Sequence, residues 1–160
     1  MFLKFFTEYP HVVYSIIGWG YIFAFIRLKD IKRLFPIGIL SGLLLFGATY
    51  WLVSLNLYKF NNSFLPILGI PFFYALWGTG SGIIFAYYFG EKPLRRFIIV
   101  LGFAGLVVFM ESLAENVKSV EHVGKFNNIY EYVFNVMILS VLAFVMTNLY
   151  ESRLRKVKNH

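Results

Sequence analysis

Long apolar stretches alternate with short polar segments along this chain. The stretches cover residues 9–26, 34–55, 64–89, 97–117 and 129–150. Each is near or above the length of about 20 residues that crosses a bilayer as a helix, and backbone groups in lipid must be paired within such a segment. The pattern therefore predicts an all-α fold, a polytopic transmembrane helical bundle of about five helices, with residues 1–160 as a single transmembrane domain.

Composition agrees with a membrane location. Hydrophobic residues make up 59% of the chain and charged residues only 14%, which is too little charge to cover a soluble domain. The net charge of +7 would suit nucleic acid in a soluble protein, but the basic residues lie between and after the apolar stretches. We therefore assign them to membrane topology and expect no nucleic-acid partner. With no cysteine in the chain, we also expect no disulfide, and we assign no cofactor and no metal.

The basic residues also predict the orientation of the helices. If five helices alternate, one side of the membrane receives Arg27, Lys29, Lys32, Arg33, Lys92, Arg95, Arg96, Arg153, Arg155, Lys156 and Lys158. The other side receives Lys4, Lys59, Lys118 and Lys125. Because cytoplasmic loops carry an excess of Lys and Arg, the N-terminus is expected outside and the C-terminal tail in the cytoplasm. The predicted location is the cell membrane, as a multi-pass protein.

Prolines mark the expected ends of several helices. Pro36, Pro66 and Pro93 lie where helices are expected to begin, and a missing N–H is harmless there. Pro71 falls inside the third apolar stretch, so we expect it to kink that helix.

Two glycine pairs have the four-residue spacing that lets helix backbones approach closely in lipid: Gly38 with Gly42, and Gly78 with Gly82. Helix rise places both pairs, together with Gly102 and Gly105, in the cytoplasmic half of the membrane. We expect this half to be tightly packed. The GTGSG segment at 78–82 lacks the lysine of a phosphate-binding loop, and the alternative to helix packing is local unwinding around an ion site.

The fourth and fifth apolar stretches contain acidic residues. Their presence requires an explanation, since inserting a charge at the centre of a spanning helix costs about 2.5–3.5 kcal/mol of free energy. Glu111 lies well inside the fourth stretch, and Glu115 follows one turn later. The fifth stretch returns with Glu131 and, one turn deeper, Asn135. Helix rise then places Glu111 level with Asn135, and Glu115 level with Glu131, on faces that can meet.

Three carboxylates at close quarters cannot all stay ionised without a partner. The partners expected at this depth are His11, Lys118 or Lys125, or a bound cation, and Tyr58 is a further source of a hydroxyl. The ligand-binding candidates are Glu111, Asn135, Glu115, Glu131, His11, Tyr14 and Tyr50. Two structural alternatives stay open. In one, Glu115 and Glu131 reach interfacial water; in the other, Glu111 and Asn135 form an interhelical hydrogen bond.

The segment from Glu115 to Asn128 is the longest connection between the apolar stretches. It carries Lys118, Glu121, His122 and Lys125, and we expect a solvated external loop. A single histidine does not make a metal site, so none is assigned to His122.

Three segments of the chain carry a family resemblance: LNLYKF (55–60), SFLPILGIPFFYAL (63–76) and FMESLAENVKSVEHVGKFNNIYEYVFN (109–135). In these segments the chain resembles a functionally uncharacterised family of small five-helix membrane proteins of spore-forming Firmicutes. The resemblance implies a proline at the start of the third helix, an acid near the end of the fourth and an aromatic position leading into the fifth. Pro66, Pro71, Glu111 and Tyr130 would fill these places. It implies a fold and a bacterial cell membrane, but no activity.

The favoured hypothesis is a non-enzymatic bundle whose outward-facing polar pocket binds a small ligand, lipid or ion. One alternative is a structural or regulatory membrane subunit whose polar cluster only fixes helix packing. A second is an intramembrane enzyme that uses Glu111 as a general base on a lipid-linked substrate. The expected partners are the lipid bilayer, a small ligand or cation, and a second copy of the chain or another membrane protein.

Overall fold

The computed structural model describes residues 7–90 and 92–150, with side chains up to residue 148. Over these residues the chain forms five α-helices: α2 (Pro10–Phe25), α3 (Leu28–Ser54), α4 (Phe72–Tyr88), α5 (Pro93–Asn116) and α6 (Asn128–Val145). Helix α6 continues into a π-helical turn, η1 (Met146–Tyr150). The predicted all-α class is confirmed. Lys4 and the basic tail at 151–160 lie outside the described residues.

Four very short strands form two antiparallel pairs in the connections. Strand β1 (Tyr58–Phe60) pairs with β4 (Val120–His122), so that Tyr58 lies opposite His122. Strand β2 (Pro66–Ile67) pairs with β3 (Ile70–Pro71) in a hairpin just before α4. The first pair joins the α3–α4 connection to the α5–α6 connection, which are far apart in the sequence.

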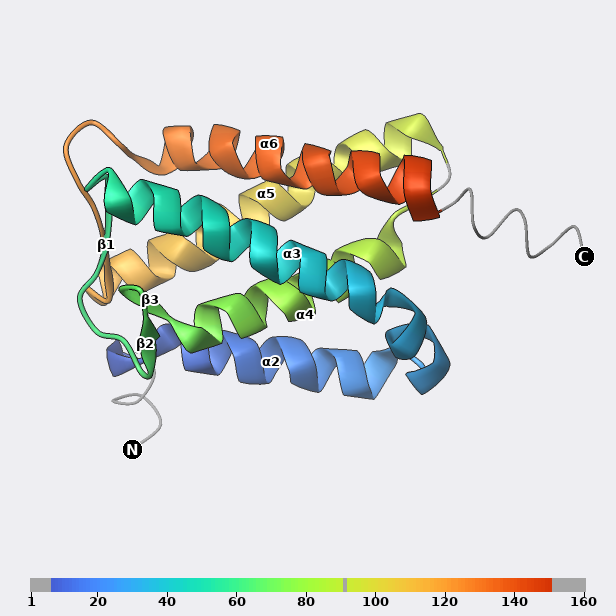
Figure 1. Ribbon diagram of the computed structural model, residues 1–160, viewed down its shortest axis with the longest axis horizontal. Helices are drawn as coiled ribbons and strands as arrows, with labels where there is room; N and C mark the ends of the chain where they lie inside the picture. Colours follow the sequence, from blue (N-terminus) through green and yellow to red (C-terminus); the bar gives the residue numbers. More distant parts are fainter. Residues whose placement is uncertain (1–6, 91, 151–160) are drawn as a thin grey trace, which may run out of the picture.

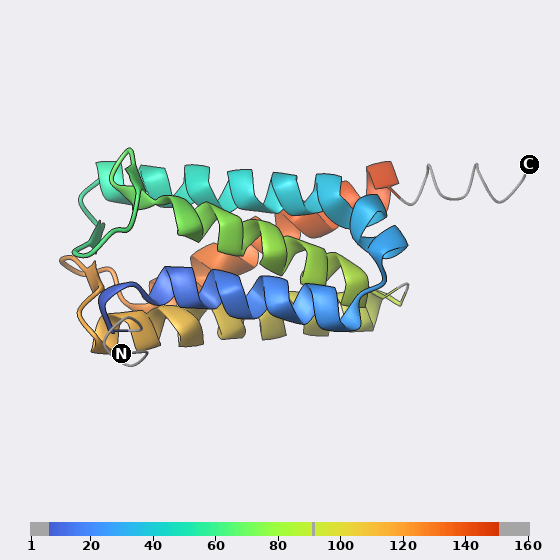
Figure 2. The same cartoon turned by 90° about the horizontal axis from the view of Figure 1, so that it is seen from below.

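The helices run back and forth between two ends of an elongated bundle (Figure 1). All four strands lie at the end where α3 and α5 finish, which we call the strand end; the opposite end, where α3 and α5 begin, is the turn end. Helix α4 lies between α2 and α3 and packs on both (Figure 2), and α5 packs on α6. The bundle therefore consists of a three-helix group and a helix pair, which meet where α3 contacts α6 and α4 contacts α5.

Three of the described helical segments are long and apolar enough to cross a membrane: Leu28–Ser54, Pro93–Asn116 and Asn128–Asn148. Helix α2 has 16 residues and α4 has 17, which at helix rise gives each a length of about 25 Å. These two fall short of a hydrocarbon core about 30 Å thick. The molecule is thus a transmembrane helical bundle of three long helices and two shorter ones, α2 and α4.

Glycines set the closest contact in the bundle, between α3 and α4. A Cβ added to Gly38 would lie 2.9 Å from the Thr79 carbonyl oxygen, and one added to Gly42 would lie 2.9 Å from the Ala75 carbonyl oxygen. From the other side, a Cβ on Gly82 would lie 3.2 Å from the Gly38 Cα. The two backbones can approach this closely only because these positions carry no side chain. We call this contact the glycine seam, formed by Gly38, Gly42, Gly78 and Gly82.

The expected close packing does not extend to the fourth apolar stretch. Nothing lies within 4 Å of a Cβ added to Gly102, and a Cβ on Gly105 would lie 3.8 Å from the Tyr132 ring. These two glycines lie on a helix that touches α4 only sparsely. The tight contact is therefore confined to α3 and α4.

The third helix begins at Phe72 rather than near residue 64, and the predicted kink at Pro71 is wrong. Pro71 is the extended N-cap of α4, with φ −60° and ψ 132°. Pro66, which was expected to open the helix, pairs with Pro71 in the hairpin instead. Two prolines within one turn and a half remove the N–H groups that a helix would need there, and Gly69, at φ +81°, reverses the chain between them.

The second helix begins at Leu28 rather than near residue 34, so Pro36 lies inside it and not at its entrance. Asp30 supports the added turns, because its carboxylate contacts Arg27 Nε at 2.9 Å and Arg33 at 3.9 Å, each three residues away. The first turns of α3 bend away from the rest of the helix (Figure 2), as expected where a proline removes an internal hydrogen bond.

The glycine seam gives a first prediction. Replacing Gly42 with alanine should push α3 away from the Ala75 carbonyl and lower stability by about 1–3 kcal/mol, the usual cost of overpacking. Thermal unfolding in detergent measures this. Gly102→Ala is the matched control, because the added methyl group meets open space and alanine favours helix. Equal unfolding midpoints for the two variants would show that the seam is not tight.

Candidate functional site

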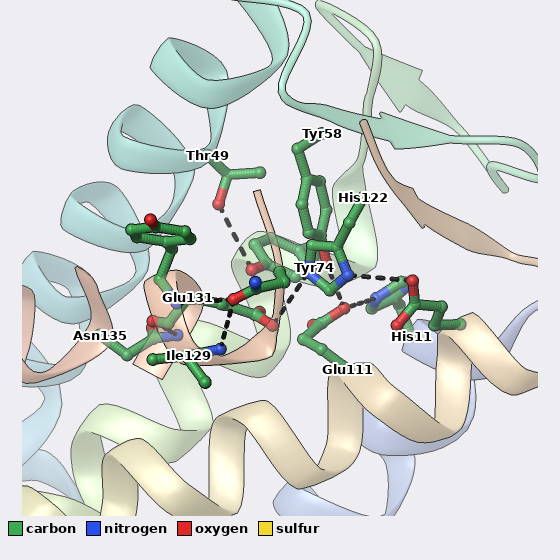
Figure 3. A network of polar contacts seen from close by, with 12 residues as sticks. His11, Thr49, Tyr58, Tyr74, Glu111, His122, Ile129, Glu131 and Asn135 are labelled. Atoms are coloured by element: carbon green, nitrogen blue, oxygen red, sulfur yellow. Dashed lines mark hydrogen bonds and ion pairs between the residues drawn. The ribbon is translucent and has the colours of Figure 1, made fainter. Parts of the chain in front are cut away.

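A cluster of polar side chains lies inside the bundle near the strand end (Figure 3). Its members come from all five helices and from the β1–β4 pair: His11, Thr49, Tyr58, Tyr74, Glu111, His122, Glu131 and Asn135. Between this cluster and the turn end, the interior of the bundle is filled by fully buried apolar residues such as Ile22, Ile83 and Phe85. The cluster is therefore closed off from the turn end.

Glu111 is the deepest acid of this cluster, with no exposed surface. Tyr58 donates a hydrogen bond of 2.6 Å to its Oε2 atom, and Nε2 of the buried His11 lies 3.4 Å from the same oxygen. Among the described residues, Glu111 Oε1 has no hydrogen-bond partner. Glu111 is thus held by contacts with α2 and β1, and not by contacts with α6, the helix that packs on α5.

His11 is placed for this contact by the packing of α2. Pro10 begins the helix, where its missing N–H costs nothing. One turn after His11, Ser15 donates a hydrogen bond of 2.6 Å to the Phe73 carbonyl of α4. Tyr14 donates one of 2.8 Å to the Met110 carbonyl, next to Glu111 on α5. These bonds join α2 to both neighbouring helices and direct the His11 ring toward Glu111.

His122 contacts two further acids, Glu115 and Glu131. Its Nδ1 atom lies 3.0 Å from Glu115 Oε1, and its Nε2 atom lies 3.2 Å from Glu131 Oε2. The exposed fraction of the side chain is 38% for Glu115, 6% for His122 and 5% for Glu131. The three groups therefore form a line that leads from the surface into the bundle.

The structure corrects the expectation of a solvated external loop at His122, whereas much of the rest of the α5–α6 connection is exposed. Pairing of β4 with β1 places His122 beside the Tyr58 ring, with ring centroids 5.4 Å apart. The imidazole is covered because the strand pair folds the connection back over the end of the bundle. Lys118 and Lys125, which were considered as partners of Glu111, are exposed instead.

A small cavity continues the line of polar groups beyond Glu131. It has a volume of about 10 Å³ and is lined by Thr49, Tyr58, Tyr74, Glu131 and Asn135, together with apolar side chains. That is room for about one water molecule, with enough polar partners to hold it. The cavity is too small for a lipid or an organic ligand.

Thr49 and Tyr74 are brought together by the glycine seam. Thr49 lies seven residues after Gly42, about two turns of helix, so both are on one face of α3. Tyr74 lies one turn before Gly78 on the matching face of α4. The result is a hydrogen bond of 3.3 Å from Thr49 Oγ1 to the Tyr74 hydroxyl.

Two groups of the strand pair have shifted pKa values. Burial, and then the Glu111 carboxylate, raise the pKa of Tyr58 well above its ordinary value, so its hydroxyl stays a hydrogen-bond donor. Burial by itself lowers the pKa of His122, but its hydrogen bonds to the Glu131 and Glu115 carboxylates outweigh burial and raise it. His122 therefore tends to carry its proton at a higher pH than an ordinary histidine.

The structure brings together most of the candidates named from the sequence, but not all of them in the expected way. Glu115 and Glu131 lie level, as helix rise suggested, and His122 bridges them. Asn135 does not form the hydrogen bond to Glu111 that one alternative expected. Its Nδ2 atom donates instead to the Glu131 carbonyl within α6, at 3.0 Å. Tyr50 is 45% exposed and lies outside the cluster, since the adjacent Thr49 faces inward.

Glu115 reaches the surface, as one alternative held, whereas Glu131 does not. Among the described residues, no group of three His, Cys, Asp or Glu side chains is arranged to hold a metal ion.

The sequence did not point to Thr49 or Tyr74 as members of the cluster, and it did not reveal the role of His122. The faces of α3 and α4 that carry the glycine pairs also carry Thr49 and Tyr74, so helical spacing was a usable signal for these two. No comparable signal marked His122, because nothing in the sequence shows that β4 pairs with β1.

Comparison with protein-family models, curated proteins and solved structures finds no match to this chain. The resemblance to five-helix proteins of spore-forming Firmicutes therefore stays a prediction, and the argument for function rests on the geometry of the cluster.

Removal of the Tyr58 hydroxyl tests whether the Glu111 contact supports the fold. Tyr58→Phe should lower stability by about 1.5–3 kcal/mol, because it removes a hydrogen bond to an acidic group and leaves that group buried. Tyr50→Phe makes the same chemical change at an exposed site and should alter stability by less than about 0.5 kcal/mol. Thermal unfolding of the two variants under one condition gives the comparison; equal losses would contradict the assignment.

The raised pKa of His122 predicts a pH-dependent contribution to stability. A histidine whose pKa is higher in the folded than in the unfolded state contributes its full stabilisation below the unfolded-state pKa of about 6.5. This stabilisation is lost as the pH rises through the folded-state pKa. The stability difference between the parent and His122→Gln should therefore be largest near pH 6 and shrink at higher pH. Unfolding midpoints measured across this range test it. Lys125→Gln, an exposed cation of the same connection, should give a difference that does not change with pH.

Proposed function

We propose that this protein is an integral membrane protein that binds and releases a proton at the buried pair of Glu111 and His11, with access from one side of the membrane. The observation that carries the proposal is a fully buried carboxylate whose partners are a histidine and a tyrosine, inside a bundle with membrane-spanning helices. Ionisable groups within a membrane are costly and pair with one another, and they commonly form proton relays.

The Glu111–His11 pair has the chemistry for this role. A carboxyl group and an imidazole 3.4 Å apart can share one proton between them. Gaining or losing a proton then changes the net charge of a site from which water is largely excluded. Such a change is felt strongly in a low-dielectric interior, so the occupancy of the site can bias the packing of the helices around it.

The line of groups toward the surface supplies a path for the proton. Glu115 is exposed to the medium, and His122 can accept a proton at Nδ1 and release one from Nε2 toward Glu131. A water in the adjoining cavity would connect Glu131 to the Tyr58 hydroxyl. Tyr58 already bonds to Glu111, so the path ends at the Glu111–His11 pair.

The size of the cavity favours a proton over the other ligands considered. Space for about one water leaves no room for an organic molecule or a lipid chain. Beyond the cluster, toward the turn end, the core around Ile22, Ile83 and Phe85 is apolar. This supports access to the site from the strand end.

We further propose that the strand end faces outward. The described basic residues of the turn end are Arg27, Lys29, Lys32, Arg33, Lys92, Arg95 and Arg96, whereas the strand end has Lys59, Lys118 and Lys125. An excess of Lys and Arg marks the cytoplasmic side. On this basis the N-terminus is outside and the proton exchanges with the external medium. The resemblance to five-helix proteins of spore-forming Firmicutes supports the cell membrane of a bacterium as the location.

A purely structural role for the cluster is the second candidate, favoured by the fact that its members come from all five helices. Hydrogen bonds between spanning helices hold the bundle in register. In this case Glu111 would keep one protonation state across the pH range and would serve packing alone.

Glu111→Gln separates the two proposals, because the amide keeps the shape of the side chain but cannot titrate. For the proton-binding role, the infrared spectrum of the parent in lipid should show a carboxyl band that changes with pH and shifts on deuterium exchange. This band should be absent in Glu111→Gln, whereas the unfolding midpoint should stay close to that of the parent. Glu111→Leu is expected to lose about 1–3 kcal/mol, since Tyr58 and His11 are left without a partner.

Glu121→Gln is the control for the infrared experiment, because this acid lies on the exposed side of β4. Its spectrum should keep the pH-dependent band. If Glu111→Gln also keeps the band, proton binding at Glu111 is wrong and the structural role stands.

A further inference from the structure

The hairpin before α4 carries apolar side chains where a hairpin in water would carry polar ones. Residues 60–90 include no Asp, Glu, Lys, Arg or His. Within this segment the exposed fraction is 43% for Phe64, 59% for Leu65, 46% for Ile67, 65% for Leu68 and 42% for Phe72. We call the outer face formed by these five residues the hairpin face.

The backbone of the hairpin holds two of these leucines outward at a conformational cost. Leu68 and Gly69 form the two-residue turn between β2 and β3, with φ values of +52° and +81°. Both central residues of such a turn need positive φ, which glycine, asparagine and aspartate tolerate and leucine does not. Leu65 is also at φ +52°. A leucine at the exposed tip, where asparagine would suit the backbone better, makes the tip apolar in spite of the conformational cost.

The inner face of the hairpin is fixed to the bundle. Ile70 has no exposed surface and belongs to the buried cluster around Tyr74 and Trp77. The Phe72 amide donates a hydrogen bond of 3.0 Å to the Leu65 carbonyl and so closes the base of the hairpin. Strand β3 leads directly into α4. The position of the hairpin therefore sets the start of the helix that carries Tyr74.

The geometry points to the lipid bilayer as the occupant of the hairpin face. We propose that the hairpin lies in the boundary between headgroups and acyl chains at the strand end, with Leu65 and Leu68 inserted among the lipids. Helix α4 has 17 residues, about 25 Å, and ends short of a hydrocarbon core about 30 Å thick. The hairpin fills the remaining depth, and the pairing of β2 with β3 satisfies part of its backbone in that environment.

Neighbouring residues continue the same surface. At the end of the spanning helix α3, Trp51 is 57% exposed and Leu55 is 50% exposed. A Cβ on Gly69 would lie 3.8 Å from Val53, which places the hairpin turn against this part of α3. Tryptophan and tyrosine gather at the level of the lipid headgroups, so Trp51 marks the depth at which the hairpin lies. The lipid-facing surface of α3 is thus continuous with the hairpin face.

Fluorescence quenching tests this placement, because the chain has no cysteine and single labels can be introduced. The probe is an environment-sensitive fluorophore on Leu68→Cys, in nanodiscs of neutral phosphatidylcholine. Nitroxide-labelled lipid in the membrane should quench it strongly, and iodide in the water only weakly. A label on Lys125→Cys, in the exposed α5–α6 connection, should give the opposite result. Leu65→Cys provides a second position on the hairpin face.

Each pattern of quenching gives a decision, provided that the labelled variants keep the unfolding midpoint of the parent. Iodide quenching of Leu68 and Leu65 labels as strong as that of Lys125 would place the hairpin in water and overturn the proposal. Protection from both quenchers would show that a second copy of the chain covers the face, which also excludes lipid. Proton binding at Glu111 does not enter into this measurement.

Discussion

A carboxyl group buried inside a membrane-spanning bundle has to find its partners within the protein, and Glu111 finds them at the strand end of the three-helix group. His11 comes from the first turn of α2, and Tyr58 from the strand after α3. These contacts require α2, α5 and β1 to meet at one depth. The arrangement of the strand end follows from this requirement, because β4 must pair with β1 for His122 to cover the same region.

The glycine seam is the second constraint, and it supports the first. Close approach of α3 and α4 fixes the rotation of both helices about their axes, since only the glycine faces can meet. With that rotation set, Thr49 and Tyr74 point at each other and Tyr50 points away. A packing contact between small residues thus decides which polar groups line the cavity beside Glu131.

The two halves of the bundle have different physical characters. The half at the turn end is filled by aliphatic and aromatic side chains that leave no surface exposed, such as Ile83 and Phe85. The half at the strand end combines buried acids, histidines and tyrosines with an apolar hairpin on the outside. A polar interior surrounded by an apolar exterior is what a membrane requires of a buried polar site.

The sequence by itself determined the helical class, the approximate spans, the glycine contacts between α3 and α4 and the deep position of Glu111. Each of these depends on a local property: hydrophobic length, the spacing of small residues, or one acid in an apolar run. The tertiary structure decided the partners of Glu111, the cover over His122 and the hairpin at Pro66 and Pro71. Those features depend on which distant segments pair, and a strand of three residues has too little periodicity to reveal its partner.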